Sequence, residues 1–436
     1  MADLDEIAKR VFLQTLRAIE PASVIKRELK VDNDILILGG REIPLDAYQE
    51  VVLIGLGKAS VTMGAAVESV FGNRVKRGIL VTDRRPRLAV RSEVVVAGHP
   101  LPDSKSLTAG QRIVDVIESC TDRSLIVFLI SGGGSSLVEL PLSADISLED
   151  LRFTNKVLIG CGASIREINS VRKHLSRIKG GRLGYLARKS QCIALYFSDV
   201  NAGDIRSIAS NPLLPDDSSP EEFSNVVKKF NLMEKLPRSV VEAIGRSEAV
   251  GLSRNWHASE PVTLLLLDNS KAVQTAAELA RQHGFRVEVD AQLIEGDYER
   301  VAEQSIDRLL KFKSSFPGER VCVISGGEVS CPVHAAGIGG RNQEFVLYSA
   351  ALLVGSGIRE GAAVLSCGTD GIDGNSKAAG AVASPQSVIK AARGCEDAIS
   401  FISNNDSNSF FKKTGGLIVT GPTGNNVRDL RILMAQ

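Results

Sequence analysis

Short apolar runs that end abruptly in glycine and small polar residues recur along the whole chain. The runs are VVLIGLGKAS (51–60), VVVAGHPLPD (94–103), LIVFLISGGGSS (125–136), CIALYFSDVNAGD (192–204), TLLLLDNS (263–270), VCVISGGEVS (321–330), AAVLSCGTDGIDG (362–374) and GLIVTGPTGNN (416–426). Such runs are typical of strands buried on both faces, as in a mostly parallel sheet. Helical periodicity usually follows each run, so the pattern predicts a three-layer α/β architecture.

The segment 165–178 shows how the helices are predicted. Its apolar residues recur at helical spacing, and Ser164 with Glu167 has the spacing of a capping box. Gly180-Gly181 comes next, a pair that favours a left-handed end to the helix. His174 stands one position from the apolar stripe, so we expect a partly buried, hydrogen-bonded histidine rather than a catalytic base.

Two polar breaks divide the chain. Residues 211–223 (NPLLPDDSSPEEF) are typical of an exposed loop, and residues 253–261 (SRNWHASEP) form a second break before an apolar run. We expect the domain boundary near the second break. This predicts one α/β domain at 1–255 and another at 256–436, and the C-terminal strand could return to the first domain.

Composition and charge exclude several classes of protein. Hydrophobic residues make up 44% and charged residues 24%, as in ordinary globular proteins. The formal charge of +1 offers no field for nucleic acid or an anionic membrane, and no apolar run approaches the ~20 residues of a membrane helix. The seven cysteines include no C-x-x-C pair and the five histidines are scattered. We therefore expect reduced thiols in a cytoplasmic protein, and no zinc site.

Any anion must then be held by local geometry, and the loop Ser131-Gly132-Gly133-Gly134-Ser135-Ser136 fits that role best. Glycine and serine let backbone N–H groups converge on an anion at the end of a strand. Lys58 also follows a buried strand, where an ammonium can reach a bound phosphate. The Walker A spacing fails around Gly57-Lys58, and Ser60 replaces the third glycine of the dinucleotide fingerprint.

Further candidate residues follow later strands. Arg341 and Asn342 come after Gly339-Gly340, and a guanidinium suits carboxylate or phosphoryl oxygens. The carboxylates at strand ends are Asp199, Asp204, Glu328, Asp370 and Asp373. Mg²⁺ needs only one or two carboxylates beside substrate phosphates. Taken singly, each glycine loop could be a plain turn, each cation a surface residue and each Asp a cap; together they favour phosphoryl transfer.

Several longer strings resemble the glycerate 2-kinases of the MOFRL type, also called class II glycerate kinases. The resemblance runs from about Ile7 to Leu430, in the order that the family has it. The strings are SGGGSS (131–136), NSVRKHLSRIKGGRL (169–183), GGRNQE (339–344), GTDGIDG (368–374), NDS (405–407) and VTGPTGNNVxDL (419–430).

The resemblance implies two α/β domains, the N-terminal one Rossmann-like with a mostly parallel sheet, and an active-site cleft between them. It implies ATP-dependent phosphorylation of the 2-hydroxyl of D-glycerate, with Mg²⁺ or another divalent cation, and leaves a homodimer open. The family's lysine corresponds to Lys58 and its arginine to Arg341. The family usually has SDVPGD and ASGP, whereas this chain has SDVNAGD (198–204) and ASNP (209–212), so the match at Asp204 is less secure than that at Asp199.

The site predicted on these grounds has three parts. The catalytic residues are Lys58, Arg341 and Asp199. The residues predicted to bind substrate or nucleotide are Ser131, Gly132, Gly133, Gly134, Ser135, Arg172, Asn342 and Asp370. The metal would be held by Asp199 and Glu328.

Two other functions stay open at this point. One is a hydroxypyruvate reductase, against which the incomplete dinucleotide fingerprint counts; Asp83 is its one candidate acidic partner for a ribose. The other is a non-catalytic sensor of sugar phosphates. Lys58, Arg341 and the carboxylates at the strand ends favour turnover instead.

Overall fold

The computed structural model divides the chain into two compact units, and each is described by itself. The continuous unit comprises Val24–Leu266, and the composite unit comprises Met1–Ser23 together with Leu267–Gln436. The structure describes residues 3–86, 88–200, 204–216, 219–250, 261–394 and 397–436. The predicted boundary at 255/256 lies outside the described residues. The chain changes unit in α2 (Pro21–Glu28) and at the end of β9 (Val262–Leu267).

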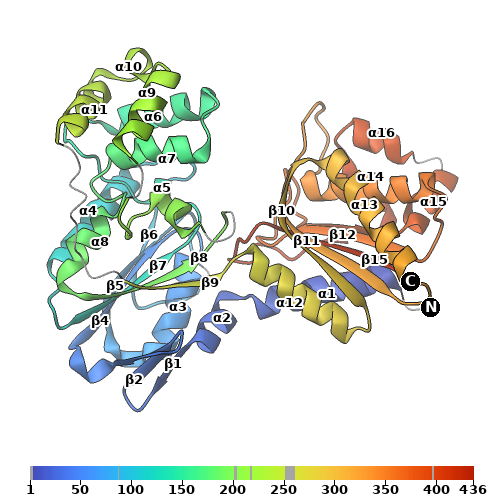
Figure 1. Cartoon of the computed structure of the whole chain (residues 1–436), viewed down its shortest axis with the longest axis horizontal. Coiled ribbons are helices and arrows are strands. Elements are labelled where there is room, and N and C mark those ends of the chain that lie inside the picture. The colour runs from blue at the N-terminus through green and yellow to red at the C-terminus, as the bar shows by residue number, and fades with distance from the viewer. Residues whose placement is uncertain (1–2, 87, 201–203, 217–218, 251–260, 395–396) are drawn as a thin grey trace. The chain divides into compact units, whose positions relative to one another are not determined.

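The continuous unit is built on a six-stranded sheet in the order β6-β5-β4-β7-β8-β9 (Figure 1). All pairings from β6 to β8 are parallel. Numbered along the chain, this is the 3-2-1-4-5-6 order of the Rossmann fold, as the sequence predicts. The strands before β9 are β4 (Glu50–Leu56), β5 (Val75–Thr82), β6 (Glu93–Val96), β7 (Ser124–Ile130) and β8 (Gln191–Phe197).

Helices cover both faces of this sheet because its strands are apolar on both faces. Val52, Ile54 and Leu56 of β4 pack with α4 (Ser104–Glu118), while α3 (Ser60–Phe71) packs on β4 and β5 from the other side. The other helices are α5 (Gly134–Leu137), α6 (Leu148–Gly160), α7 (Ile165–His174), α8 (Arg182–Leu186), α9 (Pro220–Lys229), α10 (Leu232–Lys235) and α11 (Arg238–Val250). Helices α6, α7 and α9–α11 share a core of their own.

Smaller elements complete this unit. A three-stranded antiparallel sheet is formed by β1 (Leu29–Asp32), β2 (Ile35–Leu38) and β3 (Arg41–Pro44). Short 3-10 helices lie at Leu45–Ala47, Gly72–Arg74, Ala187–Lys189 and Ile205–Ser210.

The composite unit also has a six-stranded sheet, in the order β10-β11-β15-β12-β13-β14. Only β10 and β11 pair in parallel, and the other four pairings are antiparallel. The mostly parallel pairing that the apolar runs predict is therefore confirmed only in the continuous unit. The strands are β10 (Arg286–Asp297), β11 (Val321–Ser330), β12 (Ala362–Gly368), β13 (Gly380–Ala383), β14 (Leu417–Ile418) and β15 (Asp429–Ala435).

Burial on both faces explains why the apolar runs of the composite unit look like parallel strands. In β11, Val321 and Val323 face one core, and Cys322 and Ile324 face another. Helices cover both faces, so these antiparallel strands are as apolar as parallel ones. The helices are α1 (Leu4–Ala18), α12 (Asn269–Gln282), α13 (Tyr298–Ser315), α14 (Arg341–Gly355), α15 (Pro385–Arg393), α16 (Ala398–Ser403) and α17 (Ser407–Thr414).

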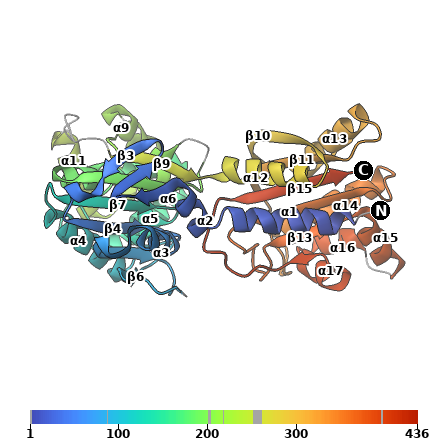
Figure 2. The same cartoon turned by 90° about the horizontal axis from the view of Figure 1, so that it is seen from below.

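Both ends of the sequence belong to the composite unit. Helix α1 buries Leu4, Ala8, Val11 and Phe12 beside α12 on one face of the sheet (Figure 2). Strand β15 lies between β11 and β12. The structure thus assigns the first helix to a different unit from the predicted N-terminal domain, and the C-terminal strand does not return to that domain. An apolar helix stripe shows that a helix is buried, but not which sheet covers it.

Two local predictions need correction. Helix α7 begins at the predicted capping box but ends at His174, because the next residues form a bridge between Ser176 and Pro141. Gly180-Gly181 does adopt positive φ, at the start of α8. The predicted exposed loop at 211–223 is buried from residue 211 to 214 and continues into α9.

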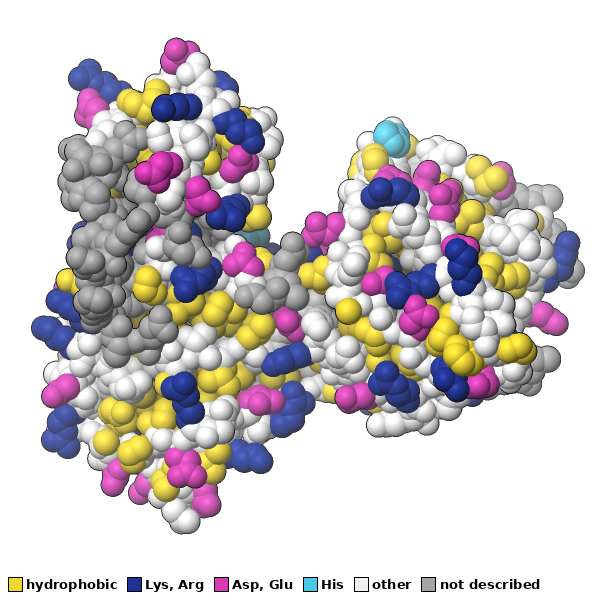
Figure 3. Space-filling view, in the orientation of Figure 1, with side chains coloured by type: hydrophobic (Ala, Val, Ile, Leu, Met, Phe, Trp, Pro, Cys, Tyr) yellow, Lys and Arg dark blue, Asp and Glu magenta, His cyan; other side chains and the backbone are white. Residues whose placement is uncertain are grey.

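Charges are mixed over the surface. On the face in view, Lys and Arg side chains alternate with Asp and Glu among the coloured residues (Figure 3). Across the described ranges, no helix combines the length and the apolar character needed to cross a membrane.

Candidate active site

The loops of Lys58 and Ser131–Ser136, far apart in sequence, meet at the carboxyl ends of β4 and β7. Leu56 is paired with Ile130 in the parallel register. Beyond it, the Ser131 N–H donates to the Leu56 carbonyl at 2.9 Å, and the Lys58 N–H donates to the Gly132 carbonyl at 2.9 Å. This is the point where the strand order reverses, which is where open α/β sheets bind ligands.

The backbone N–H groups show which loop is available to an anion. Those of residues 57–60, at the start of α3, donate to Val81, to the Ser131-Gly132 turn and to Gly57 over 2.9–3.1 Å. The N–H groups of residues 132–135 make no hydrogen bond within the described residues. We call residues 131–136 the glycine nest. An anion would therefore bind to this nest and not to the N-terminus of α3.

Lys58 and His99 border the nest, and the charge of Lys58 acts on Asp83. A Cβ placed on Gly133 would lie 3.3 Å from Lys58 Cγ and 3.1 Å from His99 Cδ2, so both side chains border this glycine. Burial would raise the pKa of Asp83, but its hydrogen bonds with Arg84 and the charge of Lys58 outweigh burial and lower that pKa. Burial and then the charge of Lys58 lower the pKa of His99. The positive charge of Lys58 is therefore felt by both Asp83 and His99.

Asp199 follows β8 and lies against the nest, because a Cβ on Gly132 would overlap its carboxylate. The nest is anchored on its other side by serines. Ser135 Oγ lies 2.7 Å from Ser210 Oγ, and Ser210 donates to the Asn169 amide oxygen at 2.7 Å. The structure therefore brings together the predicted residues Lys58, Ser131–Ser135 and Asp199.

Arg172 has a different environment from these residues. Its Nε donates to the Asn155 amide oxygen at 2.7 Å, and burial lowers its pKa. Around it, Lys179 forms a buried ion pair with Glu139. The contacts of Arg172 thus support a structural role between α6 and α7 and give no support to its predicted contact with substrate.

The remaining residues of the 169–183 string are also packed. Lys173 pairs with Asp216 at 2.8 Å, and Arg182 donates to two backbone carbonyls. His174 bonds the Ser170 carbonyl at 2.8 Å and stacks on Phe223 at 3.7 Å. It is therefore the partly buried, hydrogen-bonded histidine that the sequence predicts.

Arg341 is the first residue of α14 and lies among carboxylates. Its Nε and Nη2 donate to both oxygens of Asp429, at 2.6 and 2.9 Å, and Nη2 also donates to Glu328 at 2.9 Å. Burial alone would lower the pKa of Arg341, but Asp429 and Glu328 outweigh burial and raise it. Arg341 is therefore not a free surface residue. Its Nη1 makes no hydrogen bond with the described residues.

Asn342 and Asp370 differ in their availability. Asn342 is buried, its amide donates to Asp373 at 3.2 Å and its amide oxygen accepts from Ser366 at 2.6 Å. Both ends of the amide are engaged, which leaves the predicted substrate contact of Asn342 without support. Asp373 caps α14 through the N–H groups of residues 342 and 343. Asp370 is half-buried and accepts the Ile372 N–H at 3.0 Å.

No group of three or more His, Cys, Asp or Glu residues within the described ranges is arranged to hold a metal ion. Asp199 lies in the continuous unit, whereas Glu328 and Asp370 lie in the composite unit. Mg²⁺ keeps several waters and is usually bound by one or two carboxylates together with the phosphates of the substrate. A single carboxylate beside the nest is therefore enough for a site that the substrate completes. Asp204 is exposed and accepts from Ser207, while residues 201–203 lie outside the described residues.

Sequence reasoning missed two residues of these sites. His99 borders the nest, and Asp429 holds Arg341. His99 follows the predicted strand at 94–96, and polar residues after parallel strands gather at one edge of the sheet. The same rule that selected Lys58 would have selected His99. No local pattern marks Asp429 as the partner of a residue 88 positions earlier.

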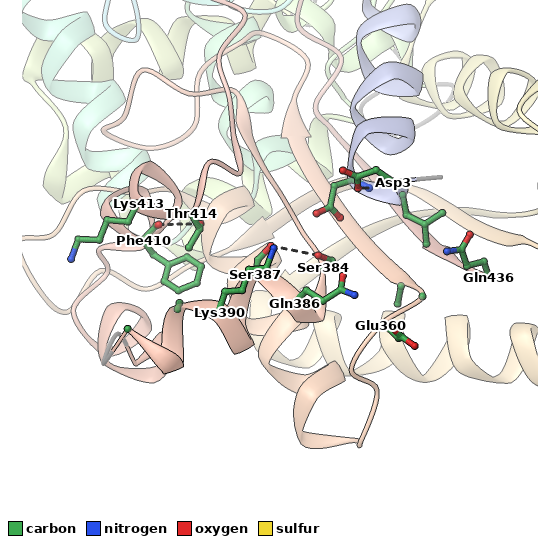
Figure 4. A pocket seen from close by; sticks show the side chains of 16 residues that line it. Asp3, Glu360, Ser384, Gln386, Ser387, Lys390, Phe410, Lys413, Thr414 and Gln436 are labelled. Atoms are coloured by element: carbon green, nitrogen blue, oxygen red, sulfur yellow. Dashed lines mark hydrogen bonds between the residues drawn. The ribbon is translucent and has the colours of Figure 1, made fainter. Parts of the chain in front are cut away.

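A cavity of about 720 Å³ lies elsewhere in the composite unit (Figure 4). It is lined by Asp3, Glu360, Ser384, Lys390 and Gln436, among others. Ala362, Ala435 and their neighbours pair at this end of the sheet, whereas Gly368 pairs with Asp429 at the end that carries Arg341. The cavity therefore contains none of the predicted site residues.

Comparisons with known proteins identify the relatives of this chain. Residues 7–245 match a family described as a domain of unknown function, DUF4147, and residues 321–429 match the MOFRL family. A D-glycerate 2-kinase from Thermotoga maritima is 33% identical over 98% of both chains. A relative from Agrobacterium vitis, named provisionally as a hydroxypyruvate reductase, is 35% identical over 88% of this chain and 98% of its own.

A solved structure of a relative has the same fold. The crystal structure of a glycerate kinase from Thermotoga maritima has a TM-score of 0.86 and 32% identity, with 99% of both chains covered. Identity at this level over almost the whole length shows a common family. The chain belongs to the MOFRL-type glycerate kinases, in which a DUF4147 module and a MOFRL module share one polypeptide.

Proposed function

We propose that this protein transfers the γ-phosphoryl group of ATP to the 2-hydroxyl of D-glycerate, giving 2-phosphoglycerate and ADP. One observation carries the proposal. Free N–H groups of the glycine nest converge with the Lys58 side chain at the switch point of the sheet, in a chain that matches a D-glycerate 2-kinase from end to end. Phosphoryl transfer needs such positioning and charge neutralisation more than covalent chemistry.

The roles of the residues follow from their chemistry. The N–H groups of residues 132–135 and the ammonium of Lys58 would bind an anionic group of a substrate. Arg341, oriented by Asp429 and Glu328, would offer its Nη1 edge to a phosphoryl or carboxylate oxygen. A preoriented guanidinium stabilises developing charge without first having to reorganise.

The proposal includes Mg²⁺ or another divalent cation. Asp199 is the carboxylate best placed to contribute to its binding, because it borders the nest. The cation would neutralise the charge of the phosphates. Glu328 is already a partner of Arg341, so its predicted role as a metal ligand is less well supported. The cleft between the domains, the cytoplasmic location and a homodimer stay predictions.

The start of α3 gives little support to the reductase alternative. A dinucleotide pyrophosphate binds to the free N–H groups at the start of the first helix of a Rossmann fold. Here those N–H groups are engaged with Val81, with the Ser131-Gly132 turn and with Gly57. Asp83, which would contact a ribose, is paired with Arg84 at 3.0 Å.

A coupled assay tests the proposed function. The purified protein should release ADP only when D-glycerate, ATP and a divalent cation are all present, and ³¹P–¹H NMR should locate the phosphate on O2 of the product. A phosphate on O3 would overturn the position of transfer. NAD(P)H oxidation with hydroxypyruvate, without use of ATP, would establish the reductase. Binding of sugar phosphates without turnover would identify a sensor.

A further inference from the structure

His99 is presented to the glycine nest by a fixed loop. The Ala97 N–H donates to the Thr82 carbonyl at 2.9 Å, which extends the pairing of β6 with β5. On the other side, Asp103 caps α4 and accepts the Ser106 N–H at 2.9 Å. The loop that carries His99 is therefore anchored at one end by β6 and at the other by α4.

The ring lies where a bound substrate would meet it. A Cβ on Gly133 would be 3.3 Å from His99 Nε2 and 3.3 Å from Lys58 Cγ, so the imidazole and the lysine border the same glycine. His99 is exposed and makes no hydrogen bond within the described residues. A ligand held by the nest N–H groups is therefore within reach of a ring nitrogen.

The surrounding charges favour the neutral ring. Although His99 is a surface residue, its ring is partly desolvated by its neighbours. This desolvation lowers its pKa, as do the positive charges of Lys58 and Arg84, and the carboxylate of Asp83 opposes them only in part. A lowered pKa favours the neutral ring, in which one nitrogen can accept a proton. A hydroxyl that attacks phosphorus must lose its proton, and a neutral imidazole is the usual acceptor.

We propose that His99 is a catalytic residue that accepts the proton of the attacking hydroxyl. This inference rests on the proposed function and deepens it. As the hydroxyl oxygen bonds to the γ-phosphorus, the bond from that phosphorus to the bridging oxygen of ADP breaks. The hydroxyl proton passes to the unprotonated nitrogen of His99 and then to water.

Two substitutions test the role, with a third as control. His99→Asn should lower kcat by about 10²–10⁴-fold while leaving the melting temperature unchanged. The wild-type kcat should fall at acidic pH, below the ordinary histidine pKa of about 6.5, and His99→Asn should lose this fall. Added imidazole should restore part of the activity of His99→Ala. His283→Asn is the control, since His283 lies in the other unit, 3.4 Å from Gln14.

Three outcomes would overturn the inference while the proposed function stands. They are a kcat of His99→Asn within about fivefold of the wild type, an acid fall that persists in this variant, and no rescue by imidazole in His99→Ala. An acid fall centred near the carboxylate pKa of about 4 would assign the proton to Asp199 instead. Complete inactivity of the wild-type protein with D-glycerate and ATP would instead overturn the proposed function itself.

Discussion

At the scale of single residues, the two predicted cations differ in what holds them. The side chain of Lys58 makes no hydrogen bond or ion pair within the described residues, although its charge acts on Asp83 and His99. Arg341 is bound to Asp429, whose side chain is 0% exposed. Removing the lysine leaves no buried partner behind, whereas removing the arginine leaves a buried carboxylate without its cation.

Lys58→Ala should therefore affect the reaction alone. We expect kcat/KM to fall by at least ~10³-fold, because a cation on the transferring phosphoryl group can contribute that much. The melting temperature should stay that of the wild type, measured by calorimetry. Lys76→Ala, an exposed lysine on β5, is the matched control and should change neither quantity. Turnover by Lys58→Ala within about tenfold of the wild type would place the lysine outside the reaction.

Arg341→Ala should lose both activity and stability. The unpaired Asp429 should lower the free energy of unfolding by roughly 1–3 kcal/mol, the cost of an unsatisfied buried polar group. The double variant Arg341→Ala/Asp429→Asn should recover part of this stability but none of the activity. Denaturant unfolding and the coupled assay measure the two effects. Equal stability of Arg341→Ala and the wild type would show that the ion pair contributes nothing to folding.

At the scale of elements, the first turn of α14 contains a carboxylic acid with an unusual environment. Glu344 is buried, and neither oxygen of its side chain has a hydrogen-bond partner within the described residues. Burial raises its pKa to about 7, and the nearby carboxylates of Asp373 and Asp406 add to the rise. Ser407 lies close enough to oppose the rise, although it makes no well-formed hydrogen bond to Glu344. The folded state thus favours the protonated acid, and ionisation of Glu344 destabilises α14.

Glu344→Gln should therefore stabilise the protein only at the higher pH. The wild type loses stability as the pH rises from 4.5, the ordinary pKa, to about 7, the folded pKa. The neutral amide does not lose this stability. The free energy of unfolding of the variant should therefore exceed that of the wild type by about 3 kcal/mol above pH 7, and the excess should vanish well below pH 4.5. Chemical denaturation at pH 5 and pH 8 measures it. A difference independent of pH would show that Glu344 is not protonated in the folded protein.

The elements were predicted from sequence more reliably than their partners. The apolar runs at 51–60 and 125–136 are strands, and the capping box at Ser164 starts a helix, because these signals are local. The direction of β15 could not be predicted, since a strand covered on both faces has the same composition in either direction. The end of α7 was missed because a distant residue, Pro141, pairs with Ser176.

The candidate site shows the same limit. The sequence predicts the nest, Lys58 and Asp199 together, since strand ends of one parallel sheet meet at one edge. It does not reveal that Asn342 is engaged in the interior or that Asp429 holds Arg341. Asn211, which stands where the family has glycine, has φ 51°, a left-handed conformation that asparagine tolerates better than most residues. This departure is therefore conservative.

At the scale of the whole molecule, Lys58 belongs to the continuous unit and Arg341 to the composite unit. If both cations act on the same phosphoryl group, their effects should not add. The variant Lys58→Ala/Arg341→Ala should then lose much less activity than the product of the two single losses, by an interaction of more than about 0.5 kcal/mol. A double-mutant cycle on kcat/KM measures it. Strict additivity would show that the two cations act independently.

The position of α1 and β15 in one unit has a consequence during synthesis. Residues 24–266 can fold while the ribosome is still translating, but α1 packs against β12, β13 and β15, which are made hundreds of residues later. At about 5–20 residues per second, the apolar face of α1 would wait on the order of 20–80 s for the last strand. The apolar face of α1 thus stays uncovered until the strands that bury it have been made, and slower translation of the C-terminal half would lengthen its exposure.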